Sequence, residues 1–346
     1  MKKSVRILAA LLCLMLAFSL GGCAEKTVQS QVFAMDTVMT LTAYGKHAQE
    51  GIDAAESVIC SMDSMLEPEY DSSYTYQINS ADSENVIVPP QVADMLKTAL
   101  TVYERSGGAL DLSVYPLYLA WGEFKEETAR VPSDEEIDGL KQMLNFGKMT
   151  VTAFEGEANY SVFVPHNTKI SFGAAAKGCA ADYAVEAMRK EGVTSAIVSL
   201  GGNVQTLGQK SDGTNWTVAV EDPRSPGYYL GTLSVGETAV VTSGNYQRYF
   251  KADGQLYHHI INPHTGKPTD NGLLSVTIVC DDGTMADCLS TAMYVLGEKA
   301  ALSYWRDYGG FDMIMVTNDG RVICTSGLIE VFSLTNTDKY IVSFVE

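Results

Sequence analysis

The sequence is poor in cations and in histidine. Among 346 residues, 24 are Lys or Arg and 42 are Asp or Glu, so the formal charge at neutral pH is −18. A surface this acidic is not expected to bind a nucleic acid. Any phosphate that the protein binds must be neutralised locally, by a metal ion or by a few well-placed cations. Of the five histidines, three lie within "HHIINPHTGKP", residues 258–268.

Cysteines are few and are not arranged as metal ligands. Beyond Cys13 and Cys23, five remain, at positions 60, 179, 280, 288 and 324. An odd number without a CxxC pair predicts neither a disulfide framework nor a zinc ribbon. Cys280 and Cys288 could pair in an oxidising compartment, but nothing in the sequence requires it.

The familiar nucleotide and hydrolase motifs are also missing. There is no GxxxxGK[ST] loop, no GxGxxG between a strand and a helix, and no GxSxG elbow. These absences argue against a P-loop protein, a dinucleotide-binding domain and an α/β-hydrolase. The content of 46% hydrophobic and 19% charged residues suits a globular chain with a large core.

The N-terminus has the pattern of a targeting segment. "MKKSVR" is basic, and the apolar run that follows is too short for a comfortable membrane span. The run ends in "LGGC", which resembles a bacterial lipobox. This resemblance implies a signal peptide over residues 1–22 and a lipid-anchored Cys23 with a short tether over 23–30. It places the protein on the extracytoplasmic face of the cell membrane.

An ordinary secretory signal is the alternative. Cleavage would remove three cations and lower the formal charge to −21.

Helical and strand patterns are mixed in the rest of the chain. Apolar spacing and end signals predict helices over residues 48–66, 89–108, 133–144, 173–192 and 284–297. One strand is expected over 32–44, a hairpin with an Asp-Gly turn over 248–260, and further strands over 195–203, 216–222, 230–235, 238–244 and 273–280. Because no strict βαβ rhythm appears, an α+β fold is favoured over a doubly wound sheet.

Four segments combine polar groups with glycines or other small residues: "ALDLSVYPLYLAWG" with Asp111 and Ser113, "GAAAKG" with Lys177, "SLGGN", whose glycines permit close backbone approach, and "ADCLST". Asp287 and Thr291 lie four residues apart in "ADCLST", on one face of a helix. A carboxylate and a hydroxyl are hard oxygen ligands, which suit Mg²⁺ better than zinc. Lys177 lies at a helix start, where N–H groups and a cation can face a phosphate. The alternatives are structural: a helix-terminal Asp287, a solvated Lys177 and a turn-capping Asp111.

The histidines do not suggest a zinc site. His258 and His259 are neighbours in a strand, so their side chains point to opposite faces. A three-histidine zinc site is therefore not favoured. His258 and His259 are therefore expected to have different surroundings, and His264 to lie on the loop.

Seven segments, in this order, resemble the ApbE family of flavin transferases, FAD:protein FMN transferases. The resemblance covers about residues 31–333, and these are the segments: "AMDT", "ALDLSVYPL", "AAAKGCAADYA", "SLGGNVQTLG", "TSGNYQRYF", "HIINPHTGKP" and "MADCLSTAMYVLG". It implies an α+β fold of mainly antiparallel sheets packed with helices (T-fold-like), with a catalytic domain over 31–346. It also implies Mg²⁺-dependent transfer of FMN from FAD to a threonine hydroxyl of a target protein, through a phosphoester bond, with release of AMP.

The resemblance also assigns residues to roles. It implies an FAD site lined by Met35, Tyr70, Ala109, Leu110, Asp111, Lys177 and the backbone near Ile261. It implies Mg²⁺ ligands at the Ala174 carbonyl, Asp287 and Thr291. His259 is the candidate catalytic base, with a nearby carboxylate as the alternative, and Asp287 shares the catalytic role as metal ligand.

Departures from the family pattern affect the site. Asp36 stands where a glycine is common, "SFGA" stands where Asp-Leu-Gly-Gly is common, and Asn262 replaces an aspartate. These put the local backbone around the flavin in question, but not the family.

Two other functions remain open at this point. An FAD pyrophosphatase would use the same site with water as acceptor, and a non-catalytic flavin-binding lipoprotein would need no metal. The expected partner is a redox-complex subunit or extracytoplasmic flavoprotein that carries a motif resembling Asp-Gly-x-Ser/Thr-Gly-Ala-Thr. This chain lacks that motif.

Overall fold

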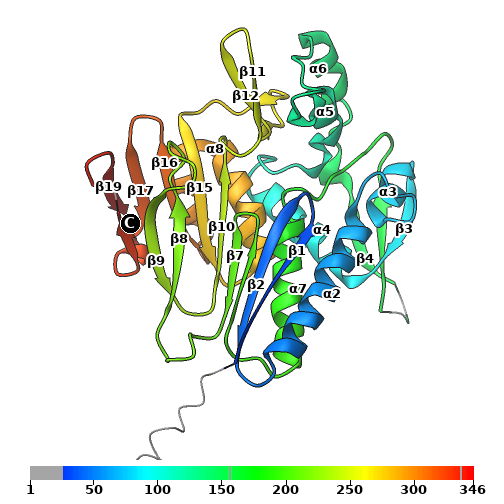
Figure 1. Ribbon diagram of the computed structural model, residues 1–346. Coiled ribbons are helices and arrows are strands. Elements are labelled where there is room, and N and C mark those ends of the chain that lie inside the picture. Colours follow the sequence, from blue (N-terminus) through cyan, green and yellow to red (C-terminus); the bar gives the residue numbers. More distant parts are fainter. Residues whose placement is uncertain (1–25, 155, 157, 336) are drawn as a thin grey trace, which may run out of the picture.

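A nine-stranded sheet forms the centre of the protein (Figure 1). The structure, a computed structural model, describes residues 26–346 except 155, 157 and 336, so the expected signal peptide and Cys23 lie outside it. All neighbouring strands in this sheet are antiparallel except β17 and β19. In spatial order the strands are β1 (Thr27–Ala34), β2 (Thr37–Tyr44), β6 (Ala196–Leu200), β7 (Asn203–Leu207), β10 (Ala239–Gly244), β15 (Leu273–Cys280), β16 (Asp312–Thr317), β17 (Arg321–Thr325) and β19 (Ile341–Val345).

Helices cover one face of this sheet and enclose the main core. They are α2 (Ala48–Leu66), α4 (Pro90–Arg105), α7 (Ala176–Lys190) and α8 (Gly283–Tyr308). Helix α2 buries Ile52, Ala55, Ile59 and Met62, residues that recur at the three- and four-residue spacing of one helical face. Helix α7 packs against both α2 and α8, so it occupies the middle of this layer.

Smaller elements cover the opposite face and one side. A three-stranded sheet packs on the opposite face around a second core, and consists of β8 (Trp216–Glu221), β9 (Tyr229–Val235) and β18 (Phe332–Leu334). Beside the helices lie α3 (Tyr74–Ser80) and a sheet of β3 (Glu84–Val88), β4 (Thr150–Ala153) and β5 (Tyr160–Val164).

A third, small core lies beyond one end of the central sheet, at the top of Figure 1. Trp121 is at its centre, stacked with Phe124 and tilted against Tyr257. The elements around it are α5 (Tyr115–Ala120), α6 (Asp134–Lys141), β11 (Tyr249–Ala252), β12 (Gln255–His258), β13 (Ile261–Asn262) and β14 (Lys267–Pro268). Short 3-10 helices occur at Leu112–Val114, Gly122–Phe124, Phe146–Lys148 and Ser326–Leu328.

The predicted α+β class is confirmed, as are the five helices in outline. Helix α6 begins as expected, with the Ser133 hydroxyl accepting the N–H of Glu136. No helix in the described part of the chain has the length and apolarity to cross a membrane. The described cysteines are all free thiols, Cys280 and Cys288 included.

Two expected elements differ from the structure. The single strand over 32–44 is wrong: it is the hairpin of β1 and β2, which turns at Met35 and Asp36 with φ of 49° and 59°. Alternation of polar and apolar residues continues through such a two-residue turn, so the pattern hid it. The helix over 284–297 does break at Gly297, where φ is 74°, but a second helical segment follows and continues to Tyr308.

Candidate functional site

The starts of helices α7 and α8 meet at Asp287. This side chain is 4% exposed, and its Oδ2 atom accepts the N–H of Gly178 at 2.9 Å. Gly178 lies in the first turn of α7, directly after Lys177. The Asp287 carboxylate therefore binds the N-terminal, positive end of a neighbouring helix.

Thr291 lies one helical turn beyond Asp287 and is tied to the sheet. Its hydroxyl is 3.3 Å from the Ser243 hydroxyl, which is also 2.8 Å from that of Ser290. Ser243 is the next-to-last residue of strand β10, directly before Gly244. The sequence predicted that Asp287 and Thr291 share a helical face, and in α8 they have that one-turn spacing.

These groups fit a Mg²⁺ ion better than any softer metal. In the described part of the chain, no group of three or more His, Cys, Asp or Glu side chains could hold a metal by itself. A single carboxylate, a hydroxyl and the Ala174 carbonyl would leave several positions for water and phosphate oxygens, as is usual for Mg²⁺. The Ala174 residue lies in the tight turn before α7, where Phe172 accepts the N–H groups of Ala175 and Ala176.

His259 lies close to Lys177 and Arg248. Its Nδ1 atom is 3.2 Å from the carbonyl of Arg248, so Nδ1 carries the proton and Nε2 is left as an acceptor. Burial lowers the pKa of His259 well below its usual value, and the positive charges of Arg248 and Lys177 lower it further. A neutral imidazole with a free Nε2 can take a proton, which is the chemistry of a general base.

The other two histidines of this segment have different surroundings. His258 is buried edge-on against Tyr294, and its Nε2 donates to the Thr269 carbonyl at 2.7 Å. His264 is exposed. The expectation that neighbouring histidines 258 and 259 differ is confirmed, because one is a core residue.

The loop 109–113 lies beside the start of α7. Ala109, Leu110 and Asp111 are all buried, and the Asp111 carboxylate accepts the N–H of Ser113 at 2.7 Å. Burial is the main cause that raises the pKa of Asp111. The N–H of Ser171 donates to the carbonyl of Leu112 at 3.1 Å, so "SFGA" connects this loop to Lys177. The structure thus gives Asp111 the capping role that was the alternative, in a position next to the predicted site.

The turn at Met35 approaches the same region from the sheet edge. Met35 donates its N–H to Asp63 Oδ1 at 2.7 Å. Asp36 has the left-handed backbone that a glycine would adopt without cost, and its carboxylate is 3.9 Å from the Arg248 guanidinium. Since the Arg248 carbonyl contacts His259, the turn is linked to His259. Tyr70, in contrast, is 55% exposed on the loop after α2.

The segment around Ile261 is held by the small third core. Ile261 is buried there, and the Trp121 indole donates to the carbonyl of Gly266 at 3.1 Å. Gly266 has φ of 71°, and a methyl group at this position would lie 2.5 Å from Ile137. The "NPHTGK" turn is therefore fixed against α6.

Comparison with known proteins identifies the family of this chain. The model of the ApbE family matches residues 35–315. The chain belongs to the ApbE family. It is 30% identical to the FAD:protein FMN transferase of Treponema pallidum, over 90% of this chain and 91% of that protein. The corresponding protein of Vibrio cholerae is 31% identical, over 82% and 86%. The ApbE protein of Thermotoga maritima has a similar structure, with a TM-score of 0.79, 29% identity and coverage of 88% and 98%.

These findings confirm the expected ApbE family, its α+β fold and its class of enzyme, the transferases. Three contacts of the site were missed by sequence reasoning: Ser243 beside Thr291, Arg248 beside His259, and the Gly178 N–H on Asp287. Ser243 and Arg248 both lie in the family segment "TSGNYQRYF", so the sequence did mark this region. Residue spacing alone, however, does not show which groups near the end of a strand face the site.

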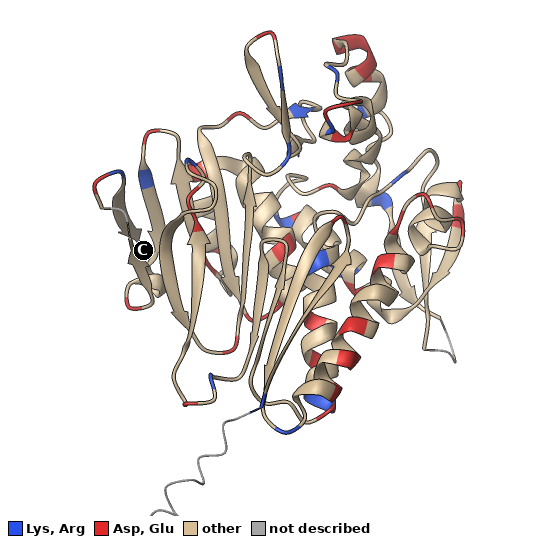
Figure 2. Ribbon diagram, in the orientation of Figure 1, with Lys and Arg blue, Asp and Glu red and all other residues tan. Residues whose placement is uncertain are grey.

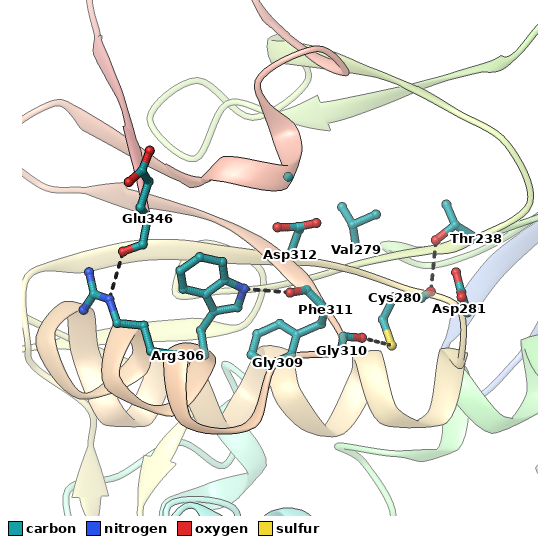
Figure 3. A pocket seen from close by; sticks show the side chains of 12 residues that line it. Thr238, Val279, Cys280, Asp281, Arg306, Gly309, Gly310, Phe311, Asp312 and Glu346 are labelled. Atoms are coloured by element: carbon teal, nitrogen blue, oxygen red, sulfur yellow. Dashed lines mark hydrogen bonds between the residues drawn. The ribbon is translucent and has the colours of Figure 1, made fainter.

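A depression in the surface lies elsewhere on this ApbE family member. It measures about 720 Å³ and lies at the far end of β15, between Trp305, Arg306, Phe311 and the C-terminal Glu346 (Figure 3). Arg306 donates to the Glu346 carbonyl oxygen at 2.9 Å, and Trp305 donates to that of Phe311 at 2.8 Å. None of the predicted site residues lines it.

Proposed function

We propose that this protein transfers the FMN half of FAD to a threonine hydroxyl of an acceptor protein, with Mg²⁺, and releases AMP. One observation carries the proposal. Residues 177 and 178 connect the two halves of the site: Gly178 donates its N–H to the Asp287 carboxylate, and burial together with positive charges that include Lys177 lowers the pKa of His259. These contacts support placing a proposed metal ligand, a cation and a proposed base near one helix start, in a family whose relatives bear the transferase name.

The start of α7 suits the pyrophosphate of FAD. The positive end of this helix and Lys177 provide positive potential on a chain of charge −18. Bound by Asp287, Thr291 and the Ala174 carbonyl, Mg²⁺ would neutralise charge on the pyrophosphate oxygens as a Lewis acid. Met35, Tyr70, Ala109, Leu110, Asp111 and the backbone at Ile261 are proposed to line the rest of the FAD site.

His259 would act on the attacking hydroxyl. Nε2 takes the threonine proton while the hydroxyl oxygen forms a bond to the FMN-side phosphorus. The bond from that phosphorus to the bridging oxygen breaks in line, and the oxygen leaves as part of AMP. His259 then releases its proton to solvent. The acceptor thereby gains FMN through a phosphoester bond.

The proposal includes a location. Cys23 would carry lipid chains, each stabilised in the membrane by about 0.8 kcal/mol per buried methylene. The enzyme would then work on the extracytoplasmic face of the cell membrane. Its acceptor would be a redox-complex subunit or flavoprotein exposed on that side.

AMP measurement separates this function from its two rivals. The mature chain, with Cys23 replaced by Ser for solubility, is incubated with FAD and Mg²⁺, with and without a peptide of the acceptor motif. We expect AMP and a flavin-labelled peptide, seen by mass spectrometry, only when the peptide is present. AMP in its absence would identify a pyrophosphatase. Bound FAD without AMP in either case would identify a flavin carrier.

A further inference from the structure

Helices α7 and α8 cap each other at their N-termini. Asp182, in the second turn of α7, accepts the N–H groups of Gly283 and Thr284 at 2.8 Å each, and the Thr284 hydroxyl at 2.7 Å. In return, Asp287 of α8 accepts the Gly178 N–H of α7. Each carboxylate therefore satisfies N–H groups that the other helix leaves without a partner.

The two helix starts are also in direct backbone contact. A methyl group on Gly178 would lie 2.1 Å from the carbonyl oxygen of Gly283. One on Gly283 would lie 2.8 Å from Asp182 Oδ1 and 2.9 Å from the Gly178 carbonyl oxygen. With backbone against backbone, no flexible side chain can absorb a shift. A movement of the first turn of α8 must therefore move Asp287 relative to α7.

Every partner of Asp182 is a donor. The fourth is Gln205 of β7, whose Nε2 donates to Asp182 Oδ1 at 2.9 Å. The Oε1 atom of Gln205 is buried without a partner, which costs free energy. The same amide group that leaves Oε1 without a partner donates through Nε2 to the Asp182 carboxylate. An amide at position 182 could accept with only one atom and would oppose N–H groups with its own NH₂.

We propose that Asp182 is a positioning residue for the metal site: it fixes α8 against α7 and so aims the Asp287 carboxylate. This inference rests on the proposed function, since it requires Asp287 to bind the ion. Asp182 touches neither substrate nor metal in this account. It acts through the first turn of α8, in the way that groups behind a metal ligand set its orientation.

Metal binding without turnover tests the role. Mn²⁺, another ion that prefers oxygen ligands, is titrated into the mature chain with ADP present, and the free ion is measured by electron paramagnetic resonance. We expect Asp182→Asn to raise the Mn²⁺ dissociation constant by about 10-fold or more, the usual effect of losing a group behind a metal ligand. Circular dichroism and the melting temperature monitor the fold.

The matched control is Asp282→Ala. The Asp282 carboxylate also caps α8, because it accepts the N–H of Met285 at 2.8 Å, but Asp282 is exposed to solvent. We expect this variant to lose some stability and keep the Mn²⁺ affinity of the parent. Equal affinity losses in the two variants would reduce Asp182 to an ordinary cap and overturn the proposal.

Two further variants keep the outcomes separate. If Asp182→Asn fails to fold, Thr284→Val takes its place, because it removes one donor to Asp182 at nearly constant side-chain volume. We expect Thr284→Val to bind Mn²⁺ more weakly than Asp282→Ala does. If Thr284→Val binds Mn²⁺ as tightly as the parent protein, the inference is overturned. Asp287→Ala should abolish binding. If Asp287→Ala binds Mn²⁺ as tightly as the parent protein does, the metal site itself is overturned. If Asp287→Ala loses Mn²⁺ binding but Asp182→Asn binds the ion as the parent does, only the positioning role is overturned.

Discussion

At the scale of single residues, the surroundings decide which groups can react. His258 and His259 are adjacent, yet one is held in the core by Tyr294 and Thr269, and the other has a free Nε2 beside two cations. The pKa of each histidine is lowered, in both cases mainly by burial. Only His259 combines a neutral ring with an open acceptor, which is what a base needs.

The lowered pKa of His259 predicts the pH dependence of the reaction. A base must be unprotonated, and His259 stays neutral until the pH falls below its lowered folded value. We therefore expect kcat/KM, which reports the free enzyme, to stay level as the pH falls from 8 through about 6.5, the pKa of an ordinary histidine. AMP release measured across this range checks it. A half-maximal rate near 6.5 would show that this histidine titrates normally.

His259→Ala tests the same role by deletion. We expect transfer to slow by roughly 10²- to 10⁴-fold, the usual contribution of a general base. FAD affinity should stay within a few-fold, because a base acts mainly in the transition state. Loss of FAD binding with unchanged turnover at saturation would reassign His259 to recognition, and unchanged transfer would point to a carboxylate as base.

The two side chains proposed as metal ligands, Asp287 and Thr291, should contribute unequally to metal binding. We expect Asp287→Ala to abolish Mg²⁺-dependent AMP release and Thr291→Ala to weaken it less, since a neutral hydroxyl contributes less to a divalent ion than a carboxylate does. Excess Mg²⁺ should largely restore Thr291→Ala and scarcely help Asp287→Ala. AMP release across a Mg²⁺ titration, with EDTA as control, measures both. A fully active Asp287→Ala, or a parent enzyme insensitive to EDTA, would contradict the metal assignment.

At the scale of elements, the crossing of α7 and α8 sets the geometry of the site. Glycines at 178 and 283 allow backbone contact, and the two aspartates bind across it. Gln205 of β7 fixes the crossing to the sheet. The site is thus held by three elements that are far apart in the sequence.

Gly178→Ala should disturb this crossing more than its single methyl suggests. The new Cβ would overlap the Gly283 carbonyl at 2.1 Å, and over-packing of a tight contact costs about 1–3 kcal/mol. We expect that loss in urea unfolding, with weaker Mg²⁺ activation. Gly139→Ala in α6 is the matched control: its Cβ meets nothing within 4 Å, so helix propensity should stabilise it by about 0.5–1 kcal/mol. Equal stabilities of the two variants would contradict the tight crossing.

At the scale of the whole molecule, charge is spread over the surface. Acidic side chains mark several turns of α2 and the start of α6, while Lys and Arg are scattered (Figure 2). Such a surface gains nothing from anionic lipid headgroups, so electrostatics does not favour the membrane. A covalent anchor would be needed to keep the protein there.

Cys23→Ser tests this anchor. With the proposed thioether removed, we expect the mature protein to appear in the soluble fraction after cell fractionation. The parent protein should stay with membranes and be released by detergent but not by salt. A Cys23→Ser protein that still sediments with membranes after a salt wash would show that the lipobox interpretation is wrong.

The sequence alone was sufficient for the family, the α+β class and the main helices. Periodicity is local information: α2 buries one face at helical spacing, and Ser133 caps α6 three residues before Glu136. Ordered motifs such as "MADCLSTAMYVLG" carry the family signal for the same reason. Asp287 and Thr291 are four residues apart, so the sequence also places them on one helical face once the helix is known.

Only the tertiary structure decided what those residues face. The hydrogen bond from Gly178 to Asp287 joins positions 109 residues apart, and that from Thr284 to Asp182 joins positions 102 apart. No local pattern contains such pairs, because they arise when two helices pack on the same sheet. Likewise, the turn at Met35 and Asp36 was hidden by strand alternation, and the neutral state of His259 depends on burial beside Arg248 and Lys177. Chemistry at this site comes from packing, whereas the sequence supplies the groups to be packed.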